Sequence, residues 1–153
     1  MQDGSASMVR IPPPVWALAY LVFGLLISDL VGWRQGLKFV PLGVVLLVAG
    51  AGLTVLAASL FHREGTELNP TSPTNQRLVT SGPFRISRNP MYLGLILLTL
   101  GIAFWIGTWP LFFVPPALFA TLNWIHIPYE EAKMRRQFGA AFEVYASKVR
   151  RWA

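Results

Sequence analysis

The sequence predicts an all-α integral membrane protein: a bundle of four transmembrane helices with a C-terminal amphipathic helix at the membrane interface. Three observations predict this class. Only 13% of the 153 residues are charged and 54% are hydrophobic, whereas a soluble domain has about 25% charged residues. The apolar residues gather in long uncharged runs. The basic residues lie between and beyond those runs.

Four apolar runs have the length and composition of membrane spans. The first contains only Ser28 and Asp29 as polar residues, and the second contains no charge. The third and fourth are separated by the turn-forming residues 107–110, which predicts a tight helical hairpin. In lipid a helix satisfies its own backbone polar groups. We therefore expect helical spans at residues 15–31, 39–61, 91–106 and 111–127 of a single membrane domain, residues 1–153. The first span is expected to be a retained anchor, since it has no small-residue cleavage pattern.

The basic residues predict the orientation of the bundle. Four spans place both termini and segment 62–90 on one side of the membrane. Eleven basic residues fall on that side, and only Arg34 and Lys38 fall on the other. By the positive-inside rule the first side is cytoplasmic, at the inner membrane if the protein is bacterial. The eleven residues are Arg10, Arg63, Arg77, Arg85, Arg88, Lys133, Arg135, Arg136, Lys148, Arg150 and Arg151.

Two cytoplasmic segments have their own patterns. Turn formers such as Thr66, Asn69-Pro70 and Ser81-Gly82-Pro83 predict an irregular course for segment 62–90 over the bundle. Beyond Pro128, apolar residues recur every three or four positions, which predicts an amphipathic helix over residues 129–151. The apolar residues concerned are Met134, Phe138, Phe142, Tyr145 and Val149.

Composition excludes several kinds of site. The chain has no cysteine, so disulfides, thiolate metal ligands and cysteine nucleophiles are absent. We expect no metal site. The net charge is +6, but the basic residues form no face with interleaved aromatic residues. Nucleic acid is therefore not an expected partner, and membrane lipid is.

Polar residues crowd the beginning of the third span, in the segment FRISRNPMYLG at 84–94. Pro90 disfavours helical geometry at Asn89 and suits the first turn of a helix. Arg88 therefore lies beside free backbone N–H groups and the positive end of the helix dipole. Tyr92 lies in the first turn, and Gly94 permits another backbone or a ligand to approach closely. Such a helix beginning suits a carboxylate or a phosphate.

Two adjacent carboxylates, Glu130 and Glu131, follow the fourth span on the same side of the membrane. One interpretation is structural: Arg88 or Arg85 forms an ion pair with one of them across the hairpin. The other is functional: a ligand with both signs of charge binds with its carboxylate toward arginine and its ammonium toward glutamate. The residues alone leave both open. His126, just before Glu130, is either a general base or a hydrogen-bonded residue near a helix end.

The order of these elements resembles the isoprenylcysteine carboxyl methyltransferase and phospholipid methyltransferase superfamily. That family has Arg-His-Pro-x-Tyr-x-Gly, then Glu-Glu after one membrane hairpin, then Phe-Gly-x-x-Tyr-x-x-Tyr. Here the corresponding residues are 88–94, Glu130-Glu131 and 138–145. The resemblance covers residues 66–149 and implies S-adenosylmethionine as cofactor in a cytosolic region formed by residues 62–90 and 128–153. A lipophilic or amphiphilic acceptor would enter from the bilayer.

Residue by residue, the resemblance implies a cofactor site and a catalytic group. The expected cofactor-binding residues are Arg88, Asn89, Pro90, Tyr92, Gly94, Glu130 and Glu131. The expected catalytic residues are Arg88, Glu131 and His126, the last only for an acceptor that must lose a proton.

This chain departs from the family pattern at two places. Asn89 replaces the usual histidine and cannot titrate. The run 123–128 lacks the arginine usual in isoprenylcysteine enzymes, which puts prenyl-cysteine as acceptor in doubt. The identity of the acceptor atom (oxygen, nitrogen or sulfur) and the oligomeric state are left open. Two alternative functions are a membrane reductase of the sterol-reductase type and a membrane scaffold without catalysis.

Overall fold

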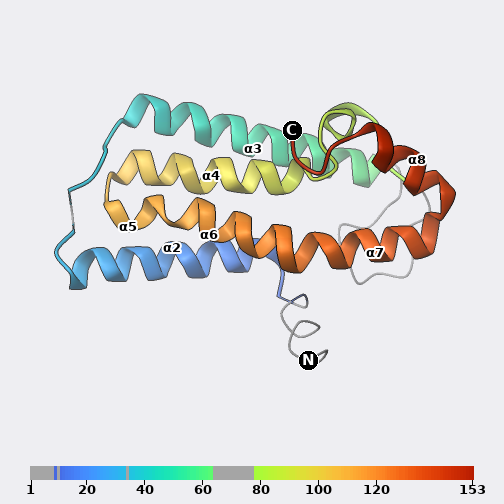
Figure 1. The fold of residues 1–153 in the computed structure, drawn as a ribbon. Coiled ribbons are helices and arrows are strands. Elements are labelled where there is room, and N and C mark those ends of the chain that lie inside the picture. Colours follow the sequence, from blue (N-terminus) through green and yellow to red (C-terminus); the bar gives the residue numbers. More distant parts are fainter. Residues whose placement is uncertain (1–8, 10, 34, 64–77) are drawn as a thin grey trace, which may run out of the picture.

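The computed structural model describes residues 9, 11–33, 35–63 and 78–153, and these residues form long helices packed side by side (Figure 1). The predicted all-helical class is confirmed for this part of the chain. The expectations for Arg10, Arg34 and Arg77, and for the turn formers at 66–73, lie outside the described residues. Three helices are long and apolar enough to cross a membrane: Pro13–Leu30, Val40–Arg63 and the continuous helix Trp109–Phe138.

The first two helices, α2 (Pro13–Leu30) and α3 (Val40–Arg63), expose most of their apolar side chains. In the apolar window of α3 only 11% of the residues are buried inside the protein. Exposed aliphatic residues would be costly in water at about 25 cal/mol per Å² of apolar surface. These surfaces are therefore the ones that would face lipid.

Close backbone packing joins α3 to α4 (Pro90–Ile106). A Cβ atom added at Gly50 would lie 2.6 Å from the carbonyl oxygen of Gly94. One added at Gly43 would lie 2.9 Å from the carbonyl oxygen of Gly101. Only glycine permits this approach, which is typical of helix pairs in membranes. The contact fixes the position of the first turns of α4 relative to α3.

The predicted tight hairpin after α4 is present. Gly107 ends α4 in the left-handed conformation, with φ of 78°, and α5 (Trp109–Phe112) begins two residues later. The chain continues through α6 (Val114–Thr121), η2 (Leu122–His126) and α7 (Ile127–Phe138). The segment η2 is π-helical. It precedes Pro128, which cannot donate a backbone hydrogen bond to the carbonyl group of Trp124 and clashes with it.

The amphipathic helix predicted over 129–151 is two helices. Pro128 does not begin a separate helix, because α7 continues directly from η2. The helix instead breaks at Gly139, whose φ of 50° and ψ of −124° are not helical, and α8 (Ala140–Lys148) then turns back toward α4 (Figure 1). Glycine adopts this conformation without steric cost.

Residues after α8 return to the segment that precedes α4. Ser87 and Arg150 form an isolated parallel bridge, and the backbone N–H of Arg88 donates to the carbonyl oxygen of Arg150 at 2.9 Å. A short 3₁₀ helix, η1 (Gly82–Arg85), leads into this segment. The return of the tail brings the beginning of α4, the helix α7 and the C-terminal residues together.

Candidate functional site

Arg88 is the centre of the contacts at the beginning of α4. Its Nη1 atom donates to the carbonyl oxygens of Ala146 at 2.9 Å and Val149 at 2.6 Å. Its Nη2 atom donates to Glu131 Oε1 at 2.7 Å. Its Nε atom is buried and has no hydrogen-bond partner among the described residues. The planar guanidinium thus joins three elements at once, as a single-point ammonium could not.

Glu131 is buried and accepts hydrogen bonds from two arginines. Arg88 contacts Oε1, and Arg151 donates to Oε2 from Nη2 at 2.8 Å and to Oε1 from Nε at 3.2 Å. Arg135 lies farther away, with an N–O distance of 3.9 Å. Of the two interpretations of Glu131, the pairing with Arg88 across the hairpin is therefore present. Charge-assisted hydrogen bonds already occupy both carboxylate oxygens. Glu131 therefore links α7 to the segment before α4 and to the C-terminal tail.

Glu130 has a different environment on the same turn. The Tyr92 hydroxyl donates to Glu130 Oε1, which joins the first turn of α4 to α7. Glu130 also lines a cavity between these helices and α8. This carboxylate, hydrogen-bonded to a neutral phenol and bordering the cavity, is better placed than Glu131 to meet a cationic ligand.

Asn89 is held by the C-terminal residues. Its Nδ2 atom donates to the carbonyl oxygen of Arg151 at 2.9 Å, and its backbone N–H donates to Ser87 Oγ at 3.1 Å. Ser87 Oγ in turn donates to the same Arg151 carbonyl at 3.1 Å. The side-chain amide of Asn89 therefore acts as a hydrogen-bond donor. This role does not require a titratable side chain such as histidine.

The other predicted site residues lie outside the cavity wall. Pro90 is buried at the first position of α4. Gly94 lies against the backbone of α3 near Gly50 and Thr54, so the close approach it permits is to another helix. His126 is fully buried at the end of η2, and both of its ring nitrogens lack a hydrogen-bond partner among the described residues.

The cavity has a volume of about 100 Å³ and a mixed wall. Its polar part is formed by Arg88, Asn89, Glu130 and Glu131. Its aromatic and thioether part is formed by Phe61, Phe84, Phe142, Tyr145 and Met134. Carboxylates and aromatic faces together suit a ligand that carries a positive charge and a flat ring.

Tyr145 supplies a hydroxyl to this wall. It donates to the carbonyl oxygen of Phe84 at 2.7 Å. Burial raises the pKa of Tyr145 to about 12, and the nearby charge of Arg88 opposes the rise. The phenol is therefore neutral at physiological pH and remains a donor. It ties α8 to η1, on opposite sides of the cavity.

The apolar lining of the cavity was not predicted from the sequence, nor were three polar residues of the site: Ser87, Tyr145 and Arg151. Tyr145 was available as the last residue of the family's third element. Arg151 was counted only as a cytoplasmic positive charge, and its position is 20 residues from Glu131 along the chain. No local pattern relates the two, since the turn at Gly139 and the return of the tail bring them together.

Comparisons with known proteins agree with the motifs. The chain is 29% identical over 119 aligned residues to two rice proteins, each named as a probable protein-S-isoprenylcysteine O-methyltransferase, from Oryza sativa subsp. indica and subsp. japonica. The alignment covers 70% of this chain and 56% of each relative, so the chain spans about half the length of these relatives. No solved structure matches the chain.

The family comparison covers the same elements. The sequence description of the phospholipid methyltransferase family matches residues 39–141, from the beginning of α3 into α8. This range includes the polar segment before α4 and both carboxylates of α7. The resemblance stated from the motifs is thereby confirmed. The chain belongs to the phospholipid methyltransferase family.

Proposed function

We propose that this protein is an integral membrane methyltransferase that transfers a methyl group from S-adenosylmethionine to a lipophilic or amphiphilic acceptor. The observation that carries the proposal is the cavity at the beginning of α4, where two carboxylates meet aromatic rings in a chain of the phospholipid methyltransferase family. The rice relatives are named for methylation of an isoprenylcysteine, and an acceptor with an apolar part suits a protein with extensive apolar surfaces.

The residues of the cavity fit the chemistry of this cofactor. When bound, the cofactor supplies a methyl group activated by a sulfonium charge. Glu130 would attract its cationic groups, and the rings of Phe61, Phe84 and Phe142 would pack against its adenine. The unpartnered Nε atom of Arg88 is a buried donor available at this wall for an anionic or carbonyl oxygen.

The cavity must open for the cofactor to enter. A volume of about 100 Å³ is below the roughly 300 to 1,000 Å³ of small-molecule sites. The proposed movable wall is α8 with the tail, which hydrogen bonds and ion pairs of Tyr145, Arg88 and Arg151 hold in place. Closure of the same contacts over the ligand would exclude water.

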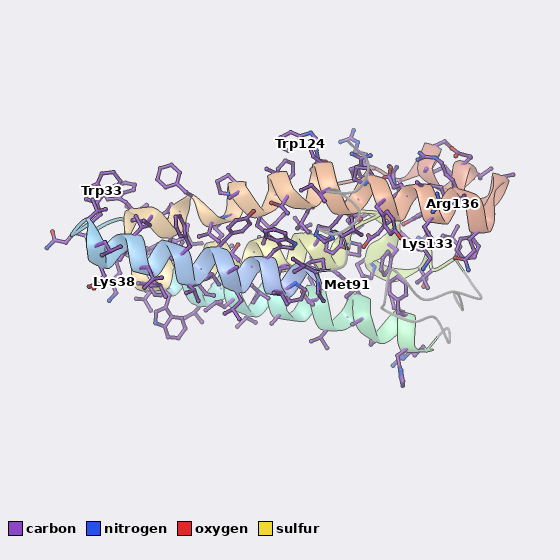
Figure 2. All side chains as sticks on the ribbon, turned by 90° about the horizontal axis from the view of Figure 1, so that it is seen from below. Trp33, Lys38, Met91, Trp124, Lys133 and Arg136 are labelled. Atoms are coloured by element: carbon purple, nitrogen blue, oxygen red, sulfur yellow. The ribbon has the colours of Figure 1, made fainter. Side chains whose placement is uncertain are left out.

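We further propose that α4 is a fourth span and that the site faces the cytoplasm. Its 17 residues are at the lower limit for a helix that crosses the bilayer core. Figure 2 shows Trp33 and Lys38 at one end of the bundle and Lys133 and Arg136 at the other. The end with the cavity also has Arg85, Lys148 and Arg150, which supports its placement on the positive side. The helix α8 would then lie at the membrane interface.

His126 is proposed to act only if the acceptor must lose a proton. A carboxylate acceptor needs no base, whereas an amine or hydroxyl does. His126 lies one turn before Glu130 on the same helix face, so an acceptor beside it would be close to the cavity. Its burial excludes water from such a proton transfer.

The test is calorimetric titration of the detergent-purified protein with S-adenosylhomocysteine. The parent should bind saturably, and Glu130→Gln should bind about tenfold more weakly or worse, since a charge-assisted bond is lost. The glutamine can still accept the Tyr92 hydrogen bond. Glu143→Gln is the matched control, because Glu143 pairs with exposed Arg135 outside the cavity. A folded parent that binds no S-adenosylhomocysteine would refute the proposal.

A further inference from the structure

Four of the described residues have buried side-chain polar atoms without hydrogen-bond partners, and two of them, Trp16 and His126, belong to neighbouring helices of the bundle. His126 is 0% exposed, and both of its ring nitrogens are unpartnered. The indole Nε1 of Trp16, on α2, is also buried and unpartnered. Each such atom costs free energy in an apolar interior. Native interiors usually supply a partner for such groups, so each residue is a candidate to bind a polar group.

The register of the neighbouring helices puts the two residues at about the same depth in the bundle. The hydroxyls of Tyr20 on α2 and Thr121 on α6 are hydrogen-bonded at 2.8 Å, which sets the register of these helices. The helices run in opposite directions (Figure 1). One turn from Tyr20 toward the N-terminus reaches Trp16, and a little more than one turn from Thr121 toward the C-terminus reaches His126. Trp16 and Tyr20 are in ring contact, with centroids 5.8 Å apart.

The backbone at this depth is irregular. His126 is the last residue of the π-helical segment Leu122–His126. A π-helical turn carries an extra residue and interrupts the regular hydrogen-bond ladder, and such turns occur frequently at functional sites. Pro128 accounts locally for the irregular turn, and the turn coincides with the unpartnered histidine.

The same residues adjoin the proposed cofactor cavity. Glu130, which lines the cavity, lies four residues after His126 on the same helix. Tyr92 donates to Glu130 and also packs against the cluster of Ala17, Leu118 and Leu122, in which Trp16 takes part. Tyr92 thus extends from the cavity wall to the level of the unpartnered groups.

Hydrogen-bonding capacity defines what can bind. Trp16 can only donate, whereas a neutral histidine donates from one ring nitrogen and accepts at the other. A hydroxyl or an uncharged amine can accept from Trp16 and donate to His126 at once. A carboxylate could accept from both residues but would bring a negative charge into the interior, which is costly without a cationic partner. Two arginines of the site, Arg88 and Arg151, already donate to Glu131.

We propose that Trp16 and His126 form a second binding site, which recognises the hydroxyl or uncharged amine of an amphiphile whose apolar chain lies in the bilayer. Its assignment as the acceptor subsite rests on the proposed methyltransferase function. Its existence as a binding site does not, because the unpartnered groups are independent of the cofactor.

The site can be tested by NMR on detergent-purified protein with ¹⁵N-labelled tryptophan. The Trp16 indole signal is assigned by Trp16→Phe or by its contact with the Tyr20 ring. Dodecan-1-ol and 4-dodecylaniline, an amine that is uncharged at neutral pH, are the probes, with dodecane and dodecanoate as controls. A saturable shift of the Trp16 signal by either probe, and not by the controls, is the expected result, and the two probes separate a hydroxyl from an amine. An equal shift by dodecanoate, or no shift by either probe because only water binds there, would overturn the proposal.

Variants then separate this site from the cofactor site. Trp16→Phe keeps an aromatic ring and removes the indole N–H, and calorimetric titration should show binding of the effective probe about fivefold weaker, the equivalent of one hydrogen bond. Trp124→Phe is the control, since Trp124 is 69% exposed on the outer face of the bundle (Figure 2). Binding of S-adenosylhomocysteine should be unchanged in both variants. Probe binding without S-adenosylhomocysteine binding would refute the methyltransferase proposal alone, and the reverse would refute this site alone.

Discussion

Arg88 and Glu131 form an ion pair with an N–O distance of 2.7 Å, although 43 residues separate them in the chain. Their side chains are only 13% and 9% exposed. The pair joins the segment before α4 to α7, and Arg151 completes it from the C-terminal tail.

Replacement of Glu131 should destabilise the fold. In Glu131→Gln the guanidinium groups of Arg88 and Arg151 lose their negative partner, and removal of one member of a buried ion pair costs on the order of 3 kcal/mol. Reversible denaturation in mixed detergent measures the free energy of unfolding. Glu143→Gln, which breaks the exposed pair with Arg135, should cost less than about 1 kcal/mol. Equal effects of the two variants would contradict the structural importance of Glu131.

Arg88→Lys should loosen the C-terminal tail. An ammonium group cannot reach the carbonyl oxygens of Ala146 and Val149 and also Glu131 in the geometry of a guanidinium. Hydrogen exchange followed by mass spectrometry should then show faster exchange in residues 149–152 than in the parent. Unchanged exchange there would indicate that the backbone contacts with Ser87 and Arg88 suffice to hold the tail.

Gly50→Ala should disrupt the packing of α3 against α4. Its Cβ would lie 2.6 Å from the Gly94 carbonyl oxygen and 2.9 Å from the backbone nitrogen of Leu98, so the helices must separate, at a cost of about 1–3 kcal/mol. Gly52→Ala is the control on the same helix, because nothing lies within 4 Å of its added Cβ. It should leave stability unchanged or raise it slightly. The melting temperatures of the two purified variants are compared by thermal unfolding. Similar melting temperatures would argue against close backbone packing of α3 against α4.

Tyr145 should ionise at a higher pH than an ordinary tyrosine. Since its pKa is raised from 10.0 to about 12 by burial, the neutral form stabilises the fold fully below pH 10. That contribution is lost as the pH rises from about 10 through 12. Ultraviolet absorbance of phenolate, compared between the parent and Tyr145→Phe, isolates this titration. A difference spectrum with its midpoint at pH 10 would show that Tyr145 is not buried against Phe84.

Much of the architecture is encoded locally and could be predicted. The helix α3 and the hairpin at Gly107 are determined by residues close together in the chain. Charge is excluded from lipid, so an uncharged run marks a span. The polar segment around Arg88 and the pair Glu130-Glu131 were recognised as one site because each has a compact motif. The end of the C-terminal helix was missed, although Gly139 was visible, because amphipathic spacing continues on both sides of it.

What the sequence by itself determined is the helical class and the polar segment before α4, and the family motifs grouped Arg88, Asn89, Glu130 and Glu131, which line one cavity in the structure. Only the tertiary structure decided their partners: Glu131 with Arg88 and Arg151, Glu130 with Tyr92, and His126 buried without a partner. The physical reason is that a helix follows from short-range hydrogen bonds and local hydropathy. The pairing of charges depends instead on the turn at Gly139 and on helix packing, which place residues tens of positions apart within hydrogen-bonding distance.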